Sequence, residues 1–559
     1  MSEMRIAAAA RWPRYAAAFL GFVWFLQVGG GPTLNPAHSR LIMSGDWMQH
    51  WFGWLMFRRE AWTLPLGTIS GLPYPIGTTL GFTDSNPLVS LLLKPFSGLL
   101  PAEFQFIGLW LAFCFAMQGY MGTALVSTVT RNVHEQLLGG YLFVLSPVLL
   151  GRIAHDTLAA HWLLLAIMYL GLREYSDTAQ ARRGGWLAAG AAVLSAAIHP
   201  YLAAMCLVLA IAALIRLWRS RLLPPVRALI VAIIGTTGVV TVFGALGYFG
   251  TAPAGASGFG DYSADVLALI NPDQFSRMLF PLRLGSASWE GLGFLGLGGV
   301  AAAAIAVVAI ARARPQFRPG TYAVIGACVL MGVFAWSWDI RVAGRQVANL
   351  HWMYEPLSRV TSPFRASGRF VWGLHYLALL FGIWGVTRIV RTRAAAGATL
   401  LAVLAVVQAA DLKMDSLWAP GTFREVPLQD FASAVGHYDH LALVPMQVRG
   451  VCRPYQEAYV YRYMLHAYRL NTTFNSGYFA RVNGAAVAEA CARLDDDVSA
   501  GRLDPRTIYV PAESHVPKFQ AAGAACGRFS GEWVCVSRER DEVFRTLVAT
   551  GRLIQRSGK

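Results

Sequence analysis

Long apolar runs fill the first part of the chain, and short alternating segments replace them after Asp411. Apolar runs of about 20 residues match the thickness of a bilayer core. The pattern therefore predicts eleven membrane-spanning helices separated by polar breaks. The predicted spans cover residues 14–31, 104–128, 136–150, 157–173, 184–199, 201–218, 227–249, 291–311, 320–338, 370–388 and 394–410.

Composition supports a membrane protein. The 559 residues are 55% hydrophobic and only 14% charged, and the mean hydropathy is +0.44, whereas a soluble globular chain carries about 25% charged residues. The net charge of +16 comes from arginines clustered at the ends of apolar runs, which is a topology signal. We therefore expect no nucleic-acid partner.

The arginine clusters orient the chain. Under the positive-inside rule they lie in the cytoplasm together with the N-terminus. The loops 32–103, 250–290 and 339–369 and the tail then lie outside. The first span has a long apolar part and no clear small-residue cleavage site after it, so we expect it to remain a span. Two domains follow, a membrane domain over 1–410 and an extracytoplasmic soluble α/β domain over 411–559.

The tail alternates strand-like runs such as "HLALVPMQV" and "RTIYVPAE" with helical ones such as "AAVAEACARL". It holds four of the seven cysteines, and an even number in an outer domain indicates disulfides. In "CGRFSGEWVCV" a hairpin turn around Ser530–Gly531 favours a Cys526–Cys535 bridge, which leaves Cys452–Cys491. The cysteines at 114, 206 and 328 lie inside spans and are expected to pack as apolar side chains.

The segment "SGDWMQHWFGWLMFRRE" (44–60) follows the first span. From Trp47 its apolar residues recur at three- and four-residue steps, with His50 on the more polar side. This spacing predicts a short helix lying in the headgroup layer, where tryptophan is favoured. Asp46 precedes the helix, either as an N-cap or as a functional carboxylate, and the two roles can coexist.

Further polar residues gather at the predicted outer breaks. Asp84 lies in the turn "TDSNP", as turn chemistry or as part of a site. In "GRIAHDTLAAHW", His155 and Asp156 occupy the second outer turn, where Asp156 is either an N-cap or functional, and His161 already lies in the next span. His199 lies in the third outer turn, before Pro200.

Two arginines, Arg365 and Arg369, end the loop 339–369 and lie on one face if the segment is helical. The planar donor fork of arginine suits phosphate oxygens. The alternative is that both side chains extend to lipid phosphates. Arginines on the outer side run against the positive-inside trend, which favours a functional role.

The order of these features resembles the GT-C glycosyltransferase superfamily: many spans with the N-terminus inside, a large acid-bearing first outer loop and a soluble outer tail. The segments "GDWMQHWFGWLMFRRE", "TDSNPL", "AHDTLAAHW", "HPYL" and "FRASGRF" also resemble an uncharacterised bacterial family grouped with GT-C enzymes. No segment resembles the WWDYG-type motif of oligosaccharyltransferases, which argues against a sequon-type peptide acceptor.

The resemblance implies a glycosyltransferase of the bacterial inner membrane with a periplasmic tail. It would move a sugar from a polyprenyl-phosphate donor to a glycan or lipid-linked acceptor. Asp46 would be the general base, His155 and Asp156 would position the acceptor or a metal ion, and Arg365 and Arg369 would bind the donor phosphate. Substrate contacts are expected from Trp47, His50, Asp84, His161 and His199.

Cofactors and alternative functions remain open from the sequence. No cofactor is certain, and a divalent Mg or Mn ion is possible because carboxylates and histidines gather at the outer breaks. One alternative function is an O-antigen ligase or polymerase-like component. The other is a polytopic transporter or flippase, for which inverted repeats would be expected and none is evident.

Overall fold

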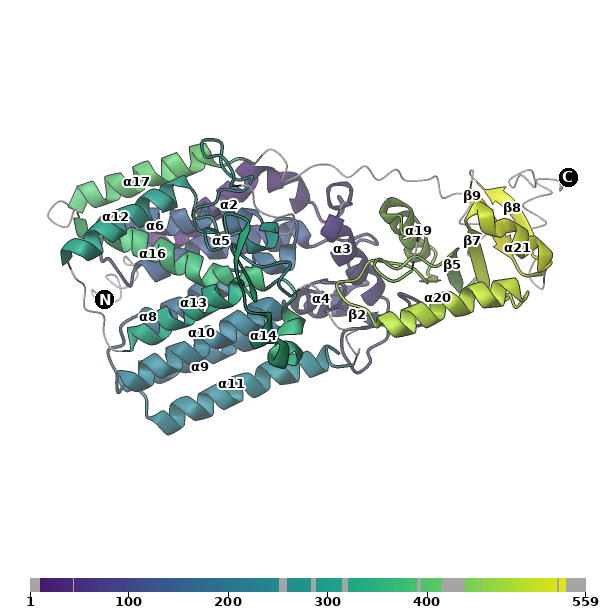
Figure 1. Ribbon diagram of the computed structural model, residues 1–559, viewed down its shortest axis with the longest axis horizontal. Coiled ribbons are helices and arrows are strands. Elements are labelled where there is room, and N and C mark those ends of the chain that lie inside the picture. Colours follow the sequence, from purple (N-terminus) through teal and green to yellow (C-terminus); the bar gives the residue numbers. More distant parts are fainter. Residues whose placement is uncertain are drawn as a thin grey trace. The chain divides into compact units, whose positions relative to one another are not determined.

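The computed structural model describes residues 11–43, 45–250, 259–282, 288–313, 320–389, 394–414, 438–452, 454–529 and 532–538 (Figure 1). By their internal contacts, the residues form two compact units. The helical unit comprises Met1–His38, Gln105–Val242 and Gly255–Ala419, and the mixed unit comprises Ser39–Phe104, Phe243–Ala254 and Pro420–Lys559. The segment that follows the first span thus groups with the tail.

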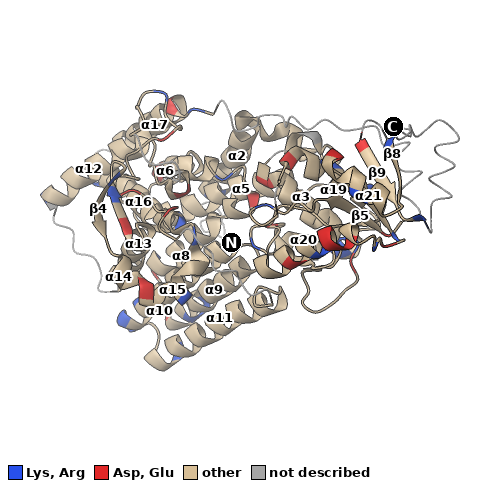
Figure 2. Cartoon of the chain, turned by 45° about the vertical axis from the view of Figure 1, so that its right-hand side comes forward, with Lys and Arg blue, Asp and Glu red and all other residues tan. Residues whose placement is uncertain are grey.

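Each of the eleven ranges predicted to span the membrane contains a helix. Most of the length of these helices is uncharged (Figure 2). In chain order they are α2 (Trp12–Phe25), α5 (Ile107–Val126), α6 (Val133–Val144) with α7 (Pro147–Leu150), α8 (Trp162–Leu172), α9 (Thr178–Ala196), α10 (Pro200–Arg219), α11 (Pro225–Ala245), α12 (Leu297–Ala313), α13 (Thr321–Ala335), α16 (Val371–Ile389) and α17 (Ala394–Asp411).

Within the part of the chain that the structure describes, six helical segments are long and apolar enough to cross a membrane. They are Trp12–Leu34, Ile107–Val126, Val133–Leu150, Pro200–Arg219, Pro225–Ala245 and Ser367–Ile389. Shorter apolar helices occupy Asp156–Leu172, Leu297–Arg312, Thr321–Ala335 and Ala395–Asp411. The chain is therefore a multi-pass membrane protein, and the number of eleven crossings stays a prediction.

Small residues allow neighbouring helices to approach closely, as is common between membrane helices. A Cβ at Gly21 of α2 would lie 2.2 Å from the carbonyl oxygen of Phe115 in α5, and one at Gly119 would lie 2.1 Å from that of Ala17. Any side chain at these two positions would force α2 and α5 apart. The free cysteines Cys114, Cys206 and Cys328 are buried in the bundle, as predicted.

Local sequence explains where several helices begin. The side chain of Asn132 accepts hydrogen bonds from the N–H groups of His134 and Glu135 at the start of α6. Asp177 accepts one from Gln180 at the start of α9. Proline at the first position of α10 has the φ angle that a first helical turn needs.

Two carboxylates hold the connecting loops of the helical unit. Asp265 accepts hydrogen bonds from the N–H groups of Ala343 and Gly344, at 3.1 and 2.9 Å, in the hairpin of β3 (Asp339–Val342) and β4 (Arg345–Asn349). Asp411 accepts from the hydroxyl of Ser276 at 2.7 Å and the N–H of Met278 at 2.9 Å. Both acids have structural partners, so neither is a candidate for chemistry.

The tail forms the predicted mixed α/β domain. Its sheet has the order β6-β5-β7-β9-β8, in which β6, β5 and β7 are parallel and β9 and β8 are antiparallel. The strands are β5 (His440–Val444), β6 (Thr473–Phe474), β7 (Thr507–Pro511), β8 (Ala525–Phe529) and β9 (Glu532–Val536), and the helices are α19 (Glu457–Arg469), α20 (Gly484–Ser499) and α21 (Val516–Ala521). The two strand-like runs and the helical run identified in the sequence became β5, β7 and α20.

The segment 39–104 of the mixed unit contains short elements. They are α3 (Gly45–Phe57), the strands β1 (Thr68–Ile69) and β2 (Thr78–Thr79), and α4 (Pro87–Leu93). The segment is hydrogen-bonded to the tail, because Phe474 N–H donates to the Gly71 carbonyl at 2.9 Å and Tyr74 N–H to the Phe474 carbonyl at 2.8 Å. Strand β6 therefore joins the two parts of this unit.

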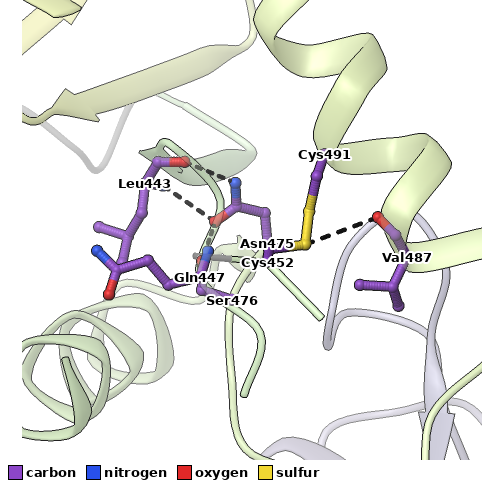
Figure 3. Close-up of a disulfide and its surroundings, with 7 residues drawn as sticks. All are labelled: Leu443, Gln447, Cys452, Asn475, Ser476, Val487 and Cys491. Carbon is purple, nitrogen blue, oxygen red and sulfur yellow. Dashed lines mark hydrogen bonds between the residues drawn. A yellow bond between two sulfur atoms is a disulfide. The ribbon is translucent and has the colours of Figure 1, made fainter. Parts of the chain in front are cut away.

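Both predicted disulfides are confirmed. Cys526 and Cys535 lie opposite each other on β8 and β9, and the predicted turn residues Ser530 and Gly531 lie outside the described residues. Cys452 bridges to Cys491 of α20 (Figure 3). Beside this bridge, the Asn475 side chain accepts from the N–H of Leu443 at 3.0 Å and donates to its carbonyl at 2.9 Å. The end of β5 is thus held by a side-chain amide as well as by strand pairing.

Loop length predicts that the two disulfides contribute unequally to stability. The bridged cysteines are 39 residues apart in Cys452–Cys491 and 9 apart in Cys526–Cys535. A disulfide stabilises the folded state by restricting the unfolded chain. The loop lengths predict a contribution of about 4 kcal/mol from Cys452–Cys491 and about 2.5 kcal/mol from Cys526–Cys535. The double Cys→Ser variant of the longer loop should therefore lower the free energy of unfolding of the tail more, measured by urea-dependent proteolysis of the full chain.

Peptide mapping without reductant is the control, since both pairs should be found linked in protein from an oxidising compartment. Free thiols at the four positions, or a larger loss from the Cys526/Cys535 variant, would contradict this account.

Candidate functional site

Four turns of the helical unit lie together at one end of its helices. They are the α7–α8 turn with the 3-10 helix η5 (Asp156–Ala159), the α9–α10 turn, η6 (Ser288–Gly291) and η9 (Ser367–Phe370). Direct contacts join them: Ala366 N–H donates to the hydroxyl of Tyr201 at 2.7 Å. A Cβ at Gly368 would lie only 2.7 Å from the Cα of Gly291, so η6 and η9 require glycine where they touch.

A buried ion cluster connects three of these turns. Arg369 binds Glu290 through two hydrogen bonds, from Nε to Oε2 at 2.8 Å and from Nη2 to Oε1 at 2.6 Å. Arg152 donates from Nη1 to the same Oε2 at 2.9 Å and from Nη2 to the carbonyl of Trp289 at 3.1 Å. The three charged side chains are between 2 and 9% exposed. Two guanidinium groups thus share one carboxylate, and these three side chains together carry a charge of +1.

The pKa of Glu290 reflects this pairing. Burial raises the pKa of a carboxyl group, but the charges of Arg369 and then Arg152 and their hydrogen bonds outweigh burial and lower the pKa of Glu290 to about 2. Glu290 is therefore ionised at every physiological pH. It is suited to hold the two arginines and not to transfer protons.

Aromatic rings extend the cluster to the predicted histidines. The guanidinium carbon of Arg369 lies 4.7 Å from the ring centre of Tyr201. The Tyr201 ring is 5.6 Å from that of His199, which is 5.5 Å from that of His155. Arg369, His199 and His155 were each predicted as site residues from a different segment of the sequence. The structure connects them in one row of contacts through Tyr201.

Asp156 lies beside this row but does not cap a helix. Helix η5 begins at Asp156, so the N-cap position is His155, and no side-chain capping bond is formed there. Asp156 is fully buried, and its carbonyl oxygen accepts a hydrogen bond from the indole of Trp110 at 2.9 Å. The capping interpretation is therefore wrong, and a buried carboxylate stands next to His155.

His161 lies deeper, at the start of α8. Its Nδ1 is 2.7 Å from the hydroxyl of Tyr376, which also accepts from the amide of Gln118 at 3.0 Å. Its ring lies 4.2 Å from that of Trp372, over which Arg152 is placed at 5.2 Å. His161 is thus connected to the ion cluster through Trp372.

Arg365 and Arg369 do not share a helix face. Ala366 has φ −91° and ψ 63°, which interrupts the helical backbone between them. Arg365 is exposed over the ring of Tyr262 at 5.1 Å, whereas Arg369 is buried against Glu290. An extended position toward lipid phosphates therefore describes at most Arg365.

The remaining predicted residues lie in the mixed unit. Helix α3 forms where it was expected, with Asp46 in its first turn, where the helix dipole favours a carboxylate. Every residue from Trp47 to Phe57 is buried, including His50, which was expected on the more polar side. The helix thus has no exposed apolar face for a headgroup layer, because protein surrounds it.

Helix α19 is one neighbour of α3. The Phe52 and Tyr461 rings stack with centres 5.7 Å apart. Burial first, and then nearby charges that include Asp46, raise the pKa of Tyr461 well above its usual value. Asp84 lies in a turn with φ +52°, and Asn86, not Asp84, caps α4 by accepting from the N–H of Val89. Asp84 also raises the pKa of Tyr248, after the larger effect of burial.

Sequence reasoning missed Arg152 and Glu290, which form the centre of the ion cluster. Both carried a signal, since each is a charged residue within an apolar stretch, "VLLGRIA" and "SWEGLGF". A charge in such a setting is costly unless it is paired. Their separation of 138 residues concealed which charge pairs with which.

Fold and site together define a multi-pass membrane protein with a buried arginine–glutamate cluster at one end of its helices. Its disulfide-bonded C-terminal domain suggests an extracytoplasmic location. The chain belongs to the DUF6311 family: the model described as "Domain of unknown function (DUF6311)" matches residues 18–413, and "DUF6311 C-terminal domain" matches residues 430–537. A search of curated proteins gave no match.

Glu290→Gln should destabilise the protein strongly, because it removes the charged carboxylate that both buried guanidinium groups bind. Breaking a buried ion pair on one side costs about 3–5 kcal/mol. Glu513→Gln is the control, since Glu513 is 68% exposed in its pair with Arg528 and should contribute less than about 1 kcal/mol. Denaturant unfolding of the full chain in detergent measures both.

The pH dependence has a defined sign. The folded pKa of Glu290, about 2, lies below the unfolded value of about 4.3, so its contribution is present above pH 4.3 and lost as pH falls toward 2. The difference in free energy of unfolding between wild type and Glu290→Gln should therefore become smaller as pH falls over that range. If Glu290→Gln lowered the free energy of unfolding at pH 7 no more than Glu513→Gln does, the stabilising role of the cluster would be contradicted.

Proposed function

We propose that the protein is a GT-C-type membrane glycosyltransferase. It moves a sugar from a polyprenyl-phosphate donor to a glycan or lipid-linked acceptor on the outer side of the bacterial inner membrane, through eleven spans with a cytoplasmic N-terminus. The resemblance of the motifs motivates this function. The observation that carries it is the net positive cluster of Arg152, Glu290 and Arg369 beside His199 and His155.

The cluster has the charge and geometry that a phosphate leaving group requires. As the sugar departs, negative charge develops on the phosphate, and fixed donors in a dry site stabilise it better than water does. Glu290 keeps both guanidinium planes in one orientation, so little reorganisation is needed. Arg365, four residues from the buried Arg369, adds an exposed guanidinium group for initial binding of the donor.

The row of His155 and His199 is suited to the acceptor. His199 contacts Tyr201, over which Arg369 lies, and His155 contacts His199, so the two histidines could orient a hydroxyl group next to the phosphate. Asp156, buried beside His155, would fix the histidine's orientation. Asp46 is assigned as general base by the resemblance, and Trp47, His50, Asp84 and His161 as substrate contacts.

An outer location fits a lipid-linked donor. Nucleotide sugars are cytoplasmic, so an enzyme acting outside needs a sugar that has been carried across on a lipid. The disulfides of the tail support that side of the membrane. A transporter or flippase is less well supported, because the ion cluster lies at one end of the helices rather than in mid-membrane. A ligase is less well supported, because such enzymes concentrate function in a large late loop, whereas the candidate acids here lie in the first and second outer loops.

Asp46→Asn tests the base assignment. Asparagine keeps the size and the capping ability of aspartate but not its basicity. A positioned base contributes about 10²–10⁴-fold, so transfer from a polyprenyl-phosphate sugar donor to membranes with the native acceptor should fall by that factor. Asp497→Asn, at an exposed ion pair with Arg502, is the control and should leave transfer unchanged.

Arg369→Lys in the same assay separates phosphate binding from charge alone. Lysine keeps the charge but cannot make the two parallel hydrogen bonds with which Arg369 is held on Glu290, so the donor group is misplaced and transfer should fall even in protein that folds. Near-normal transfer by folded Asp46→Asn would move the base assignment to Asp156. No transfer by the wild type from any polyprenyl-phosphate sugar would refute the proposed function, and chelation with EDTA decides metal dependence.

A further inference from the structure

A cavity of about 460 Å³ lies at the other end of the helical unit. It is formed by the start of α9, the end of α10 and the start of α11, which lie side by side (Figure 1). Helix α9 runs from this cavity to the turn that holds His199, so the two sites are separated by the length of α9, about 28 Å. The lining residues are Thr178, Ala179, Arg182, Trp218, Arg221, Leu222, Leu223, Pro224, Pro225 and Arg227.

Three arginines give this cavity a strong positive charge. Arg182, Arg221 and Arg227 each come from a different segment, and none forms an ion pair or a side-chain hydrogen bond within the described residues. The acid just before the cavity, Asp177, is already bound to the N–H of Gln180 at 2.8 Å. The cavity therefore presents three guanidinium groups with no protein carboxylate bound to them.

Arg221 has a backbone conformation that normally selects glycine. Its φ is +59°, and it closes α10 in a Schellman motif, with Leu222 N–H donating to the Leu217 carbonyl and Arg221 N–H to that of Trp218. A side chain in this left-handed region is disfavoured relative to glycine. The turn alone would favour glycine at position 221. An arginine in this strained conformation is therefore a sign that the guanidinium group itself has a role.

An apolar face continues from the cavity along α11. Val226, Leu229, Ile230, Ile233 and Ile234 recur at three- and four-residue steps and are 46–65% exposed. Only 22% of the apolar 18-residue stretch of this helix is buried inside the protein, as expected for a helix that faces the bilayer. Leu214, Leu217, Leu223 and Val231 belong to one buried apolar cluster, and Leu223 also lines the cavity. Positive charge and a lipid-facing apolar surface therefore adjoin.

We infer that this cavity binds the phosphate headgroup of an anionic phospholipid, whose acyl chains lie along the exposed face of α11. The volume lies within the range of about 300–1,000 Å³ typical of small-molecule sites. Basic pockets between membrane helices on the arginine-rich side bind such headgroups. The site is independent of the proposed transfer chemistry at the opposite end of α9.

Lipid retention by the full-length protein, measured by native mass spectrometry, tests this inference. The protein is exchanged into mixtures of phosphatidylglycerol and phosphatidylcholine. We expect preferential retention of phosphatidylglycerol, weakened about fivefold for each arginine removed by Arg182→Gln or Arg227→Gln. The matched control is Arg183→Gln, an exposed neighbour on α9 that does not line the cavity, and it should change retention less than twofold.

Arg221→Gly separates binding from folding. Glycine suits the left-handed backbone, so the thermal midpoint should stay the same or rise while phosphatidylglycerol retention falls. Equal retention of the two lipids by the wild type would show that the cavity is not a site for anionic lipid. The same conclusion would follow if Arg183→Gln lost as much phosphatidylglycerol as Arg182→Gln or Arg227→Gln. If millimolar inorganic phosphate displaces the lipid completely, the cavity is a site for a soluble phosphate, and the inference that it binds a phospholipid is wrong.

Discussion

Buried charge that must be paired is the constraint on which the helical unit depends. Arg152 and Arg369 both bind the carboxylate of Glu290, whose pKa they lower to about 2. Removing a guanidinium group from water is expensive unless its hydrogen bonds are satisfied. The cluster therefore fixes the positions of three turns that are far apart in sequence. The same fixed charges make this end of the bundle suited to a developing anion.

The two ends of the helical unit use arginine differently. At one end the guanidinium groups are held by a carboxylate inside the protein, so their donor planes are preorganised. At the other end Arg182, Arg221 and Arg227 surround a cavity next to an exposed apolar helix, without a protein partner among the described residues. The first arrangement suits a reacting phosphate, and the second suits a permanently bound lipid headgroup.

Much of the fold could be predicted because its causes are local. Apolar runs of bilayer length predicted the helices, and cysteine spacing within a hairpin predicted Cys526–Cys535. His155, His199 and Arg369 could be identified as polar residues at the ends of apolar runs. The pairing of Glu290 could not, because nothing local links it to Arg152 or Arg369. The burial of α3 on all sides was also missed, because its three- and four-residue spacing left His50 on a polar side that tertiary packing covers.

Photocrosslinking with a polyprenyl phosphate that carries a photoreactive group next to the phosphate tests the central claim most directly. If the Arg152–Glu290–Arg369 cluster binds the donor phosphate, crosslinks should fall on peptides containing 151–156, 199–201 or 365–370. Labelling should saturate, compete with unlabelled polyprenyl phosphate and weaken in Arg369→Lys. Unsaturable labelling, or labelling confined to the peptides around Arg182 and Arg221, would contradict the account.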